Sequence, residues 1–411
     1  MKKIVISGIT GFKNRGVDAL VTTVVEGIHT VNKSNAPITV LTDTPQYDTE
    51  SGKHLKVNFV SDTFRNRKAR YIRKLGGKPL ANALIPLVVP SFRKTVDLVE
   101  GADVVIASGG DVFSSDYGDL GEFLVSLEAA QRAGKKVVFI GHSIGPFKTK
   151  EEEEAWTRVA NQSELITLRE SFSYDYVVNK LKVPSSKVHL TADSAFNLRI
   201  PDSNCLSELA RLYGIDRDRP TIALSISQGI KKFAKVAHDG HLNAWTKLVR
   251  TATERLGLQV VIVSHVQDQW ELNDDRLASQ EVASQFSGNP LIRVVNGDHT
   301  ASELKGIIQM ADMVVAERMH AAIAGLSSGI ATAVIGYSVK AQGILFDLLQ
   351  DNVEKYRLLV SVQDFVNKID AGAWVEQLWN RRCEVGEHLA QSLPQVKNRA
   401  NQNFELLAKI L

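Results

Sequence analysis

The chain alternates short apolar segments with longer amphipathic ones, and this alternation runs through the sequence twice. Apolar segments of strand length in the first half occupy residues 3–7, 38–41, 102–107, 136–141, 165–168 and 188–191. Continuous apolar segments of this length are typical of parallel strands that are covered on both faces. The alternation therefore predicts an α/β fold built on parallel sheets.

A polar stretch separates the two rounds of this pattern. Residues 198–220 are polar and contain Pro201 and Pro220, and a new series of strands and helices starts at Thr221. Such shifts in composition mark domain junctions. We predict two Rossmann-like domains facing across a cleft, residues 1–200 and 201–370, and then a helical tail, residues 371–411.

Composition excludes several classes of protein. The 411 residues carry 49 Lys or Arg against 46 Asp or Glu, so the net charge of +3 does not indicate a nucleic-acid partner. Cys205 and Cys383 lie far apart, and the ten histidines show no metal-ligand spacing, so we predict neither a metal site nor disulfides. The first apolar run stops at Gly8, and none reaches the ~20 residues of a membrane helix, so we expect a soluble cytoplasmic protein.

Polar residues and glycines follow several of the predicted strands. In the first half they include the glycine-rich stretch 8–19, the Ser108-Gly109-Gly110-Asp111 turn, His142-Ser143 and Arg169-Glu170. Ligands of open α/β sheets bind at the carboxyl ends of the strands, so this repetition predicts a ligand cleft. The spacing of the first glycines matches neither the dinucleotide fingerprint nor a P-loop.

The segment Glu317-Arg318-Met319-His320 joins a predicted buried strand to a predicted buried helix. Amide groups at a helix start favour an anion, Arg318 offers a planar cation, and His320 offers a proton near neutral pH. Together they favour chemistry on a small anion. The alternative is structural: Arg318 pairs with Glu317, and His320 caps or packs.

A basic cluster at residues 65–74 allows contact with an acidic membrane surface or an anionic substrate. The alternative, which we favour, is a solvated helix face.

Several of these segments, taken in order, resemble the polysaccharide pyruvyl transferases. The matching segments are residues 8–19, Ser108 to Asp111, Gly141 to Pro146, Leu168 to Ser171, Ala192-Asp193, Ser227-Gln228, Glu317 to His320 and Tyr337 to Lys340. The resemblance implies a fold similar to GT-B glycosyltransferases, phosphoenolpyruvate as the donor, a sugar diol as the acceptor and no further cofactor. The acceptor is a cell-surface polysaccharide or its lipid-linked precursor, which would allow peripheral membrane contact.

The resemblance also implies roles for individual residues. The donor-binding candidates are Arg318, Lys340 and Arg169, with His320 as the general acid. Asp18 and Asp111 are candidates to orient or deprotonate the acceptor hydroxyl, and Asn14, Gly109, Gly110 and His142 are further substrate-binding candidates. The resemblance implies that residues 1–200 form the acceptor side and residues 201–370 the donor side. The chain departs from many relatives at Asp111 and at Val17-Asp18, which both lie on this acceptor side. The rival hypotheses are a nucleotide-sugar glycosyltransferase and a non-catalytic carbohydrate-binding or scaffold protein.

Overall fold

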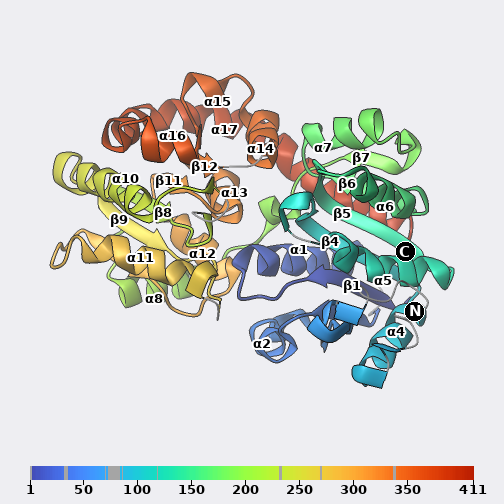
Figure 1. The fold of residues 1–411 in the computed structure, drawn as a ribbon. Helices are drawn as coiled ribbons and strands as arrows, with labels where there is room; N and C mark the ends of the chain where they lie inside the picture. Colours follow the sequence, from blue (N-terminus) through green and yellow to red (C-terminus); the bar gives the residue numbers. More distant parts are fainter. Residues whose placement is uncertain are drawn as a thin grey trace. The chain divides into compact units, whose positions relative to one another are not determined.

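The computed structural model describes residues 2–31, 36–69, 71–72, 84–85, 87–117, 119–230, 234–268, 271–336 and 339–411 (Figure 1). The chain forms two compact units, neither of which is one continuous stretch. Unit 1 holds residues 1–12, 20–194 and 399–411, whereas unit 2 holds residues 13–19 and 195–398. The predicted domains were continuous ranges, because a pattern read along the chain cannot show which segments return to an earlier unit.

Unit 1 is built on a seven-stranded parallel sheet with the order β3-β2-β1-β4-β5-β6-β7. Its strands are β1 (Ile4–Ile9), β2 (Ile38–Thr42), β3 (Asn58–Ser61), β4 (Val104–Phe113), β5 (Lys136–Ile144), β6 (Leu165–Leu168) and β7 (Val188–Leu190). The strand order reverses between β1 and β4, which is where Rossmann-like sheets open to a ligand.

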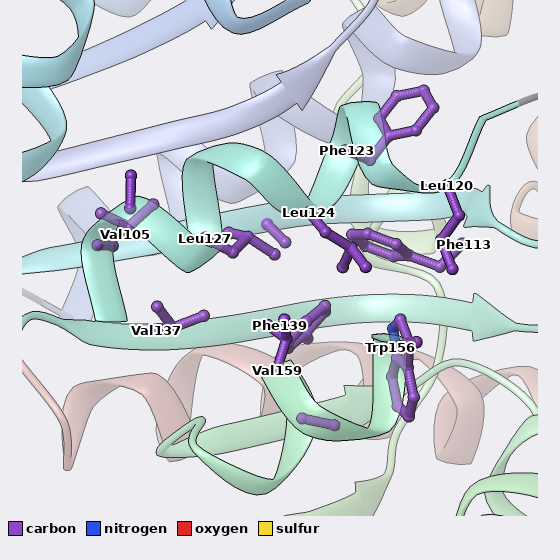
Figure 2. Close-up of a cluster of buried hydrophobic side chains, with 14 of the residues drawn as sticks. Val105, Phe113, Leu120, Phe123, Leu124, Leu127, Val137, Phe139, Trp156 and Val159 are labelled. Atoms are coloured by element: carbon purple, nitrogen blue, oxygen red, sulfur yellow. The ribbon is translucent and has the colours of Figure 1, made fainter. Parts of the chain in front are cut away.

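Helices cover both faces of this sheet. They include α1 (Arg15–Val31), α2 (Pro45–Ser51), α4 (Phe92–Glu100), α5 (Gly121–Arg132), α6 (Lys150–Asn161) and α7 (Ser171–Asp175). Figure 2 shows Leu124 and Leu127 of α5 on one side of β5, and Trp156 and Val159 of α6 on the other. The apolar stripes of these helices therefore account for the continuous apolar sequence of β5.

Unit 2 repeats the architecture with a six-stranded parallel sheet, ordered β10-β9-β8-β11-β12-β13. Its strands are β8 (Thr221–Ser225), β9 (Gln259–Val263), β10 (Ile292–Val295), β11 (Met313–Ala316), β12 (Ala331–Gly336) and β13 (Leu359–Ser361). Its helices include α8 (Ser203–Tyr213), α10 (His238–Arg250), α11 (Asp275–Ser284), α12 (Ala301–Ile308), α13 (Met319–Ser327), α14 (Val339–Leu349), α15 (Asn352–Lys355) and α16 (Val362–Asn367). The predicted fold class, two Rossmann-like α/β halves, is confirmed.

The C-terminal tail is one helix, α17 (Ala371–Ala408), with Pro394 inside it. Residues 399–411 count with unit 1. There the buried Asn403 accepts hydrogen bonds from Thr167 Oγ1 at 2.5 Å and Thr191 Oγ1 at 2.8 Å. These bonds tie the last turns to the ends of β6 and β7. In the part of the chain described, every helix is too short or too polar to cross a bilayer.

Three local predictions are wrong. The glycine stretch after residue 107 is not a turn, because β4 continues to Phe113 and pairs with β5 through a bulge near Gly110. His142-Ser143 likewise lies inside β5. β3 and β13 were missed because their short sequences lack a clear apolar period. The predicted junction, residues 198–220, also holds the capped helix α8, which was not predicted from the sequence.

Candidate active site

A pocket in unit 2 is lined by four basic side chains and six apolar residues. The basic residues are Arg15, His265, Lys305 and His320, and the apolar ones are Ala19, Ala195, Leu198, Ala301, Ile323 and Ala324. His265 follows the carboxyl end of β9, and His320 follows that of β11. The pocket thus lies where parallel sheets present ligand-binding groups.

His320 is placed by the junction between β11 and α13. Arg318 adopts an extended conformation as the N-cap residue, so the helix begins at Met319 and carries His320 in its first turn. A Cβ atom at Gly16 would lie 2.3 Å from His320 Nδ1. The absence of a side chain at position 16 therefore lets the imidazole approach the first turn of α1.

Arg15 is fully buried at the start of α1, and its contacts hold it in unit 2. Its backbone amide donates to the carbonyl oxygen of His265 at 3.0 Å. Its Nη2 donates to Gln267 Oε1 at 3.1 Å and to Asp298 Oδ1 at 2.6 Å. The Asp298 side chain is 64% exposed, whereas that of Arg15 is 0% exposed. The chain therefore keeps a permanent cation inside the pocket wall and balances it from the surface.

Burial depresses the basicity of two other pocket residues. Burial lowers the pKa of His265 to about 3, and the nearby charges of His320, Arg318 and Arg15 add to that effect. Burial also lowers the pKa of Lys305 to about 8, with a smaller contribution from Lys397. Lys305 Nζ donates to the carbonyl oxygen of Leu198 at 2.7 Å, which is a polar partner without a full charge. An anion bound here would favour the protonated forms of both groups.

Arg318 pairs with Asp275, the first residue of α11. Arg318 Nε lies 2.9 Å from Asp275 Oδ2, and Arg318 Nη2 lies 2.6 Å from Oδ1, the two parallel bonds typical of arginine and carboxylate. Arg318 Nη2 also donates to Asn273 Oδ1 at 3.2 Å. Burial raises the pKa of Asp275, whereas Arg318 and two backbone amides oppose that shift.

The alternative that Arg318 pairs with Glu317 is therefore wrong. The Glu317 carboxylate is buried and accepts hydrogen bonds from Ser227 N at 2.7 Å and Trp245 Nε1 at 3.0 Å. His241 Nε2 lies 2.7 Å from Glu317 Oε1. Glu317 thus anchors the segment that carries Arg318 and His320 to β8 and α10.

Two residues predicted for the acceptor side belong to unit 2. Asp18 is buried, and its Oδ2 accepts a hydrogen bond from the amide of Ala301 at 2.7 Å, at the start of α12. Asn14 Oδ1 accepts from the amide of Gly16 at 3.0 Å. Both residues lie within 13–19, the segment of the glycine-rich turn that packs with unit 2 rather than with the strand preceding it.

The remaining candidates of the first half lie in unit 1, where Arg169 is engaged by its neighbours. Its Nη1 lies 2.6 Å from Asp193 Oδ2 and its Nε donates to Ser143 Oγ at 2.7 Å. Burial alone would lower the pKa of Arg169, but the carboxylates of Asp193 and Asp111 outweigh it and the pKa is raised. This pair is almost completely buried.

His142 and the two glycines belong to the paired strands β4 and β5. His142 is buried, with Nε2 3.1 Å from the carbonyl oxygen of Ala107, and burial lowers its pKa to about 4. A Cβ at Gly109 would lie 3.0 Å from the carbonyl oxygen of Gly141, so close strand packing already accounts for a glycine there. Gly110 has φ +101°, a left-handed conformation that suits the bulge.

A family model described as polysaccharide pyruvyl transferase matches residues 14–339. The chain belongs to this family. The amylovoran biosynthesis protein AmsJ of Erwinia amylovora is 26% identical over 370 residues, which cover 84% of this chain and 86% of AmsJ. Family membership identifies the chain as an enzyme that acts in polysaccharide biosynthesis.

Solved structures resemble this pyruvyl transferase in fold. S. aureus MnaA, solved with UDP, superposes with a TM-score of 0.63 at 13% identity, covering 98% of this chain and 94% of MnaA. The UDP-GlcNAc 2-epimerase of Neisseria meningitidis, solved with UDP-GlcNAc, superposes with a TM-score of 0.61 at 11% identity, covering 100% of both chains. These likenesses confirm the predicted GT-B-like fold of the pyruvyl transferase.

The residues that line the pocket are not the same set that the sequence predicts for the donor site of the transferase. His320 lines the pocket. Arg318 pairs with Asp275 and is not a lining residue. Lys340, buried in the first turn of α14, is not a lining residue either. Arg15, His265 and Lys305 were not predicted. His265 follows a strand, which is a signal that could have found it, but Lys305 lies within an ordinary helical segment. In the described ranges, no three His, Cys, Asp or Glu side chains gather as around a metal ion.

Proposed function

We propose that the chain transfers a pyruvyl group from phosphoenolpyruvate to two hydroxyls of a saccharide, forming a cyclic ketal. The observation that supports this most directly is the pocket of unit 2, in which Arg15, His265, Lys305 and His320 converge. Phosphoenolpyruvate carries a phosphate and a carboxylate, so its binding requires several fixed cations. Membership in the pyruvyl transferase family favours this donor among small anions.

The four basic residues suit different parts of this donor. The planar guanidinium of Arg15 matches a carboxylate or phosphate, and the Lys305 ammonium adds a point charge. His265, neutral in the empty pocket because burial lowers its pKa to about 3, can donate one hydrogen bond or gain a proton when an anion enters. Arg318, paired with Asp275, positions the first turn of α13.

In the proposed reaction His320 is the general acid. It donates a proton to the methylene carbon of the donor, and a saccharide hydroxyl adds to the neighbouring carbon. The bond from that carbon to the phosphate oxygen then breaks, and the second hydroxyl adds to the same carbon and closes the ketal. The two hydroxyls lose two protons: one balances the new methyl group through His320, and the other leaves with phosphate.

We assign Asp18 to accept the hydroxyl proton that leaves with phosphate. Its carboxylate is fixed on the amide of Ala301, and both Ala19 and Ala301 line the pocket. Asp111 is the second candidate of the sequence and lies in β4 of unit 1. For Arg169 the buried pair with Asp193 favours a structural role over donor binding.

We place the acceptor in cell-surface polysaccharide biosynthesis, as the polymer or a lipid-linked precursor on the cytoplasmic side. This assignment follows the family and the curated relative. It requires no cofactor beyond the donor substrate.

A binding screen tests the donor. The purified chain is titrated by calorimetry with phosphoenolpyruvate, with UDP-glucose and with UDP-N-acetylglucosamine, and melting temperatures are recorded beside it. We expect binding and a raised melting temperature with phosphoenolpyruvate, and phosphate release once a saccharide acceptor is added. Binding of a UDP sugar without binding of phosphoenolpyruvate would favour the nucleotide-sugar transferase instead, which the UDP complexes among the structural neighbours make the natural alternative.

A further inference from the structure

Arg65 of unit 1 is a buried cation that the chain does not fully bond. It ends the short 3₁₀ turn Thr63–Arg65 after β3, and its side chain is 9% exposed. Nη2 lies 3.1 Å from Asp43 Oδ2, just beyond the end of β2. Nε and Nη1 are buried and make no hydrogen bond with any described residue. Buried donors left without acceptors are costly, so such a group calls for a partner.

The guanidinium of Arg65 is also held in place. It lies over the ring of Phe123, with Cζ 4.3 Å from the ring centroid. Phe123 belongs to the first turn of α5, and Figure 2 shows its ring at the edge of the apolar cluster beneath it. A stacked arginine keeps its planar fork in one orientation and is a common means of recognising carboxylate and phosphate.

The position of this pair in the sheet is that of a ligand site. A Cβ at Gly8, the last residue but one of β1, would lie 4.0 Å from Phe123 Cδ1. Gly8 has φ +84°, and the pairing of β1 with β2 shifts its register between Ile6 and Ile9, so the strand is irregular beside the aromatic ring. β1 borders the point where the strand order reverses, and ligands of such sheets gather at the carboxyl ends of the strands next to it.

We propose that Arg65 and Phe123 bind a negatively charged group of the saccharide acceptor, a sugar carboxylate or a phosphate on its carrier. The incoming oxyanion displaces Asp43, whose side chain is 37% exposed, from Nη2. Nε and Nη2 share one edge of the guanidinium, so the oxyanion then forms two parallel bonds, as Asp275 does on Arg318, and gives Nε the acceptor that it lacks. This acceptor assignment rests on the proposed function, but the anion site itself does not.

The full chain is titrated by ligand-observed NMR with methyl β-glucuronide, glucose-1-phosphate and neutral methyl β-glucoside. We expect the wild type to bind one charged probe or both at least about tenfold more tightly than the neutral one. Binding of the glucuronide would indicate that the site recognises a sugar carboxylate, and binding of glucose-1-phosphate would indicate that it recognises a carrier phosphate. Equal affinity for all three probes, or binding of none, would overturn the proposal.

Three variants distinguish a ligand site from a structural arginine. Arg65→Gln should lose charged-probe binding about 10–100-fold, whereas Arg67→Gln, on an exposed side chain two residues away, should leave it unchanged. Asp43→Asn removes the competing carboxylate and should tighten charged-probe binding severalfold. Weaker binding in Asp43→Asn would contradict the displacement, and it can be measured even if Arg65→Gln does not fold.

Donor binding separates this proposal from the proposed function. Phosphoenolpyruvate affinity is measured on the same variants, and we expect Arg65→Gln to keep the wild-type value within about twofold. If the wild type binds a charged saccharide through Arg65 but does not bind phosphoenolpyruvate, the donor assignment is wrong and the Arg65 site is still supported. Loss of phosphoenolpyruvate affinity in Arg65→Gln would instead identify Arg65 as a donor ligand and overturn its role as an acceptor site.

Discussion

Arg169 of unit 1, just after β6, and Lys305 of unit 2, inside α12, are both buried cations, but their surroundings differ. Arg169 faces the buried carboxylate of Asp193 at 2.6 Å, and its pKa is raised despite the cost of burial. Lys305 donates to a carbonyl oxygen, and burial lowers its pKa to about 8. The charge of Arg169 is matched within the fold, whereas the charge of Lys305 is only partly matched.

This difference separates a structural cation from a functional one. A matched buried pair uses its charge inside the protein and has little left for a ligand. A cation that is buried against neutral partners is costly to the empty fold, and an anionic ligand relieves that cost on binding. Basic residues alone, read from the sequence, do not distinguish the two cases.

The largest expected effect is on catalysis at His320. His320→Gln keeps a hydrogen-bond donor but removes the transferable proton, so turnover should fall about 10²–10⁴-fold with phosphoenolpyruvate affinity within about tenfold of wild type. Phosphate release beside calorimetry measures both. His238→Gln, at a half-exposed histidine of the same unit, is the control. Normal turnover at saturating donor in His320→Gln would make His320 an anion ligand only.

The next largest expected effect is on stability, at the buried Arg169–Asp193 pair of unit 1. Arg169→Gln leaves Asp193 buried without its ion-pair partner and should lower the free energy of unfolding by about 3–5 kcal/mol, measured by urea denaturation. Arg158→Gln, at a half-exposed arginine of the same unit, should change it by less than about 1 kcal/mol. If Arg169→Gln were as stable as wild type but unable to bind phosphoenolpyruvate, Arg169 would be a donor ligand and the contrast between the units would fail.

Lys305→Met should weaken donor binding without lowering stability, the opposite of the result expected for Arg169→Gln. It removes a buried charge from the empty pocket, so the melting temperature should stay level or rise, while phosphoenolpyruvate affinity falls about 10–100-fold. Lys368→Met, at a lysine whose side chain is 74% exposed, should keep the donor affinity. Unchanged donor affinity in Lys305→Met would remove Lys305 from the site.

The pKa of Lys305 near 8 gives a pH test of the same contrast. A bound anion favours the protonated amine, so donor affinity should fall by up to about tenfold per pH unit as the pH rises above 8. The empty fold should behave in the opposite way: the unfolded lysine, with its pKa of 10.5, holds its proton longer, so this contribution makes folding more favourable between pH 8 and 10.5. Lys305→Met should flatten both profiles.

Acid should destabilise both units gradually, through one buried histidine in each. His142 and His265 are buried with pKa values lowered to about 4 and 3, whereas an unfolded histidine titrates near 6.5. The unfolded chain therefore binds more protons below pH 6.5, and each ring should cost the fold at most about 1.4 kcal/mol per pH unit as the pH falls. Saturating phosphoenolpyruvate should reduce the loss of stability due to His265 but not that due to His142. Urea titrations of the His142→Asn and His265→Asn variants would measure the two contributions separately.

The sequence by itself determined the fold class and the position of the Glu317–His320 segment between a strand and a helix. Burial on both faces leaves a continuous apolar run, so the parallel strands are visible without any tertiary contact. The strand Met313–Ala316 followed by an alanine-rich helix likewise predicted that Arg318 and His320 stand where a strand gives way to a helix. Such features depend on neighbours within a few residues.

Only the tertiary structure decided which charges are matched. Arg318 meets Asp275, Arg15 meets Asp298, and residues 13–19 pack with the second unit, all through contacts between distant parts of the chain. The continuation of β4 through Gly109 and Gly110 is equally a matter of its pairing with β5. Local patterns record which residues are buried, but the partner of a buried charge is set by the folding of the whole chain. How completely that partner matches the charge decides whether the charge serves the structure or a ligand: Asp193 is buried beside Arg169, whereas Asp298 beside Arg15 is 64% exposed.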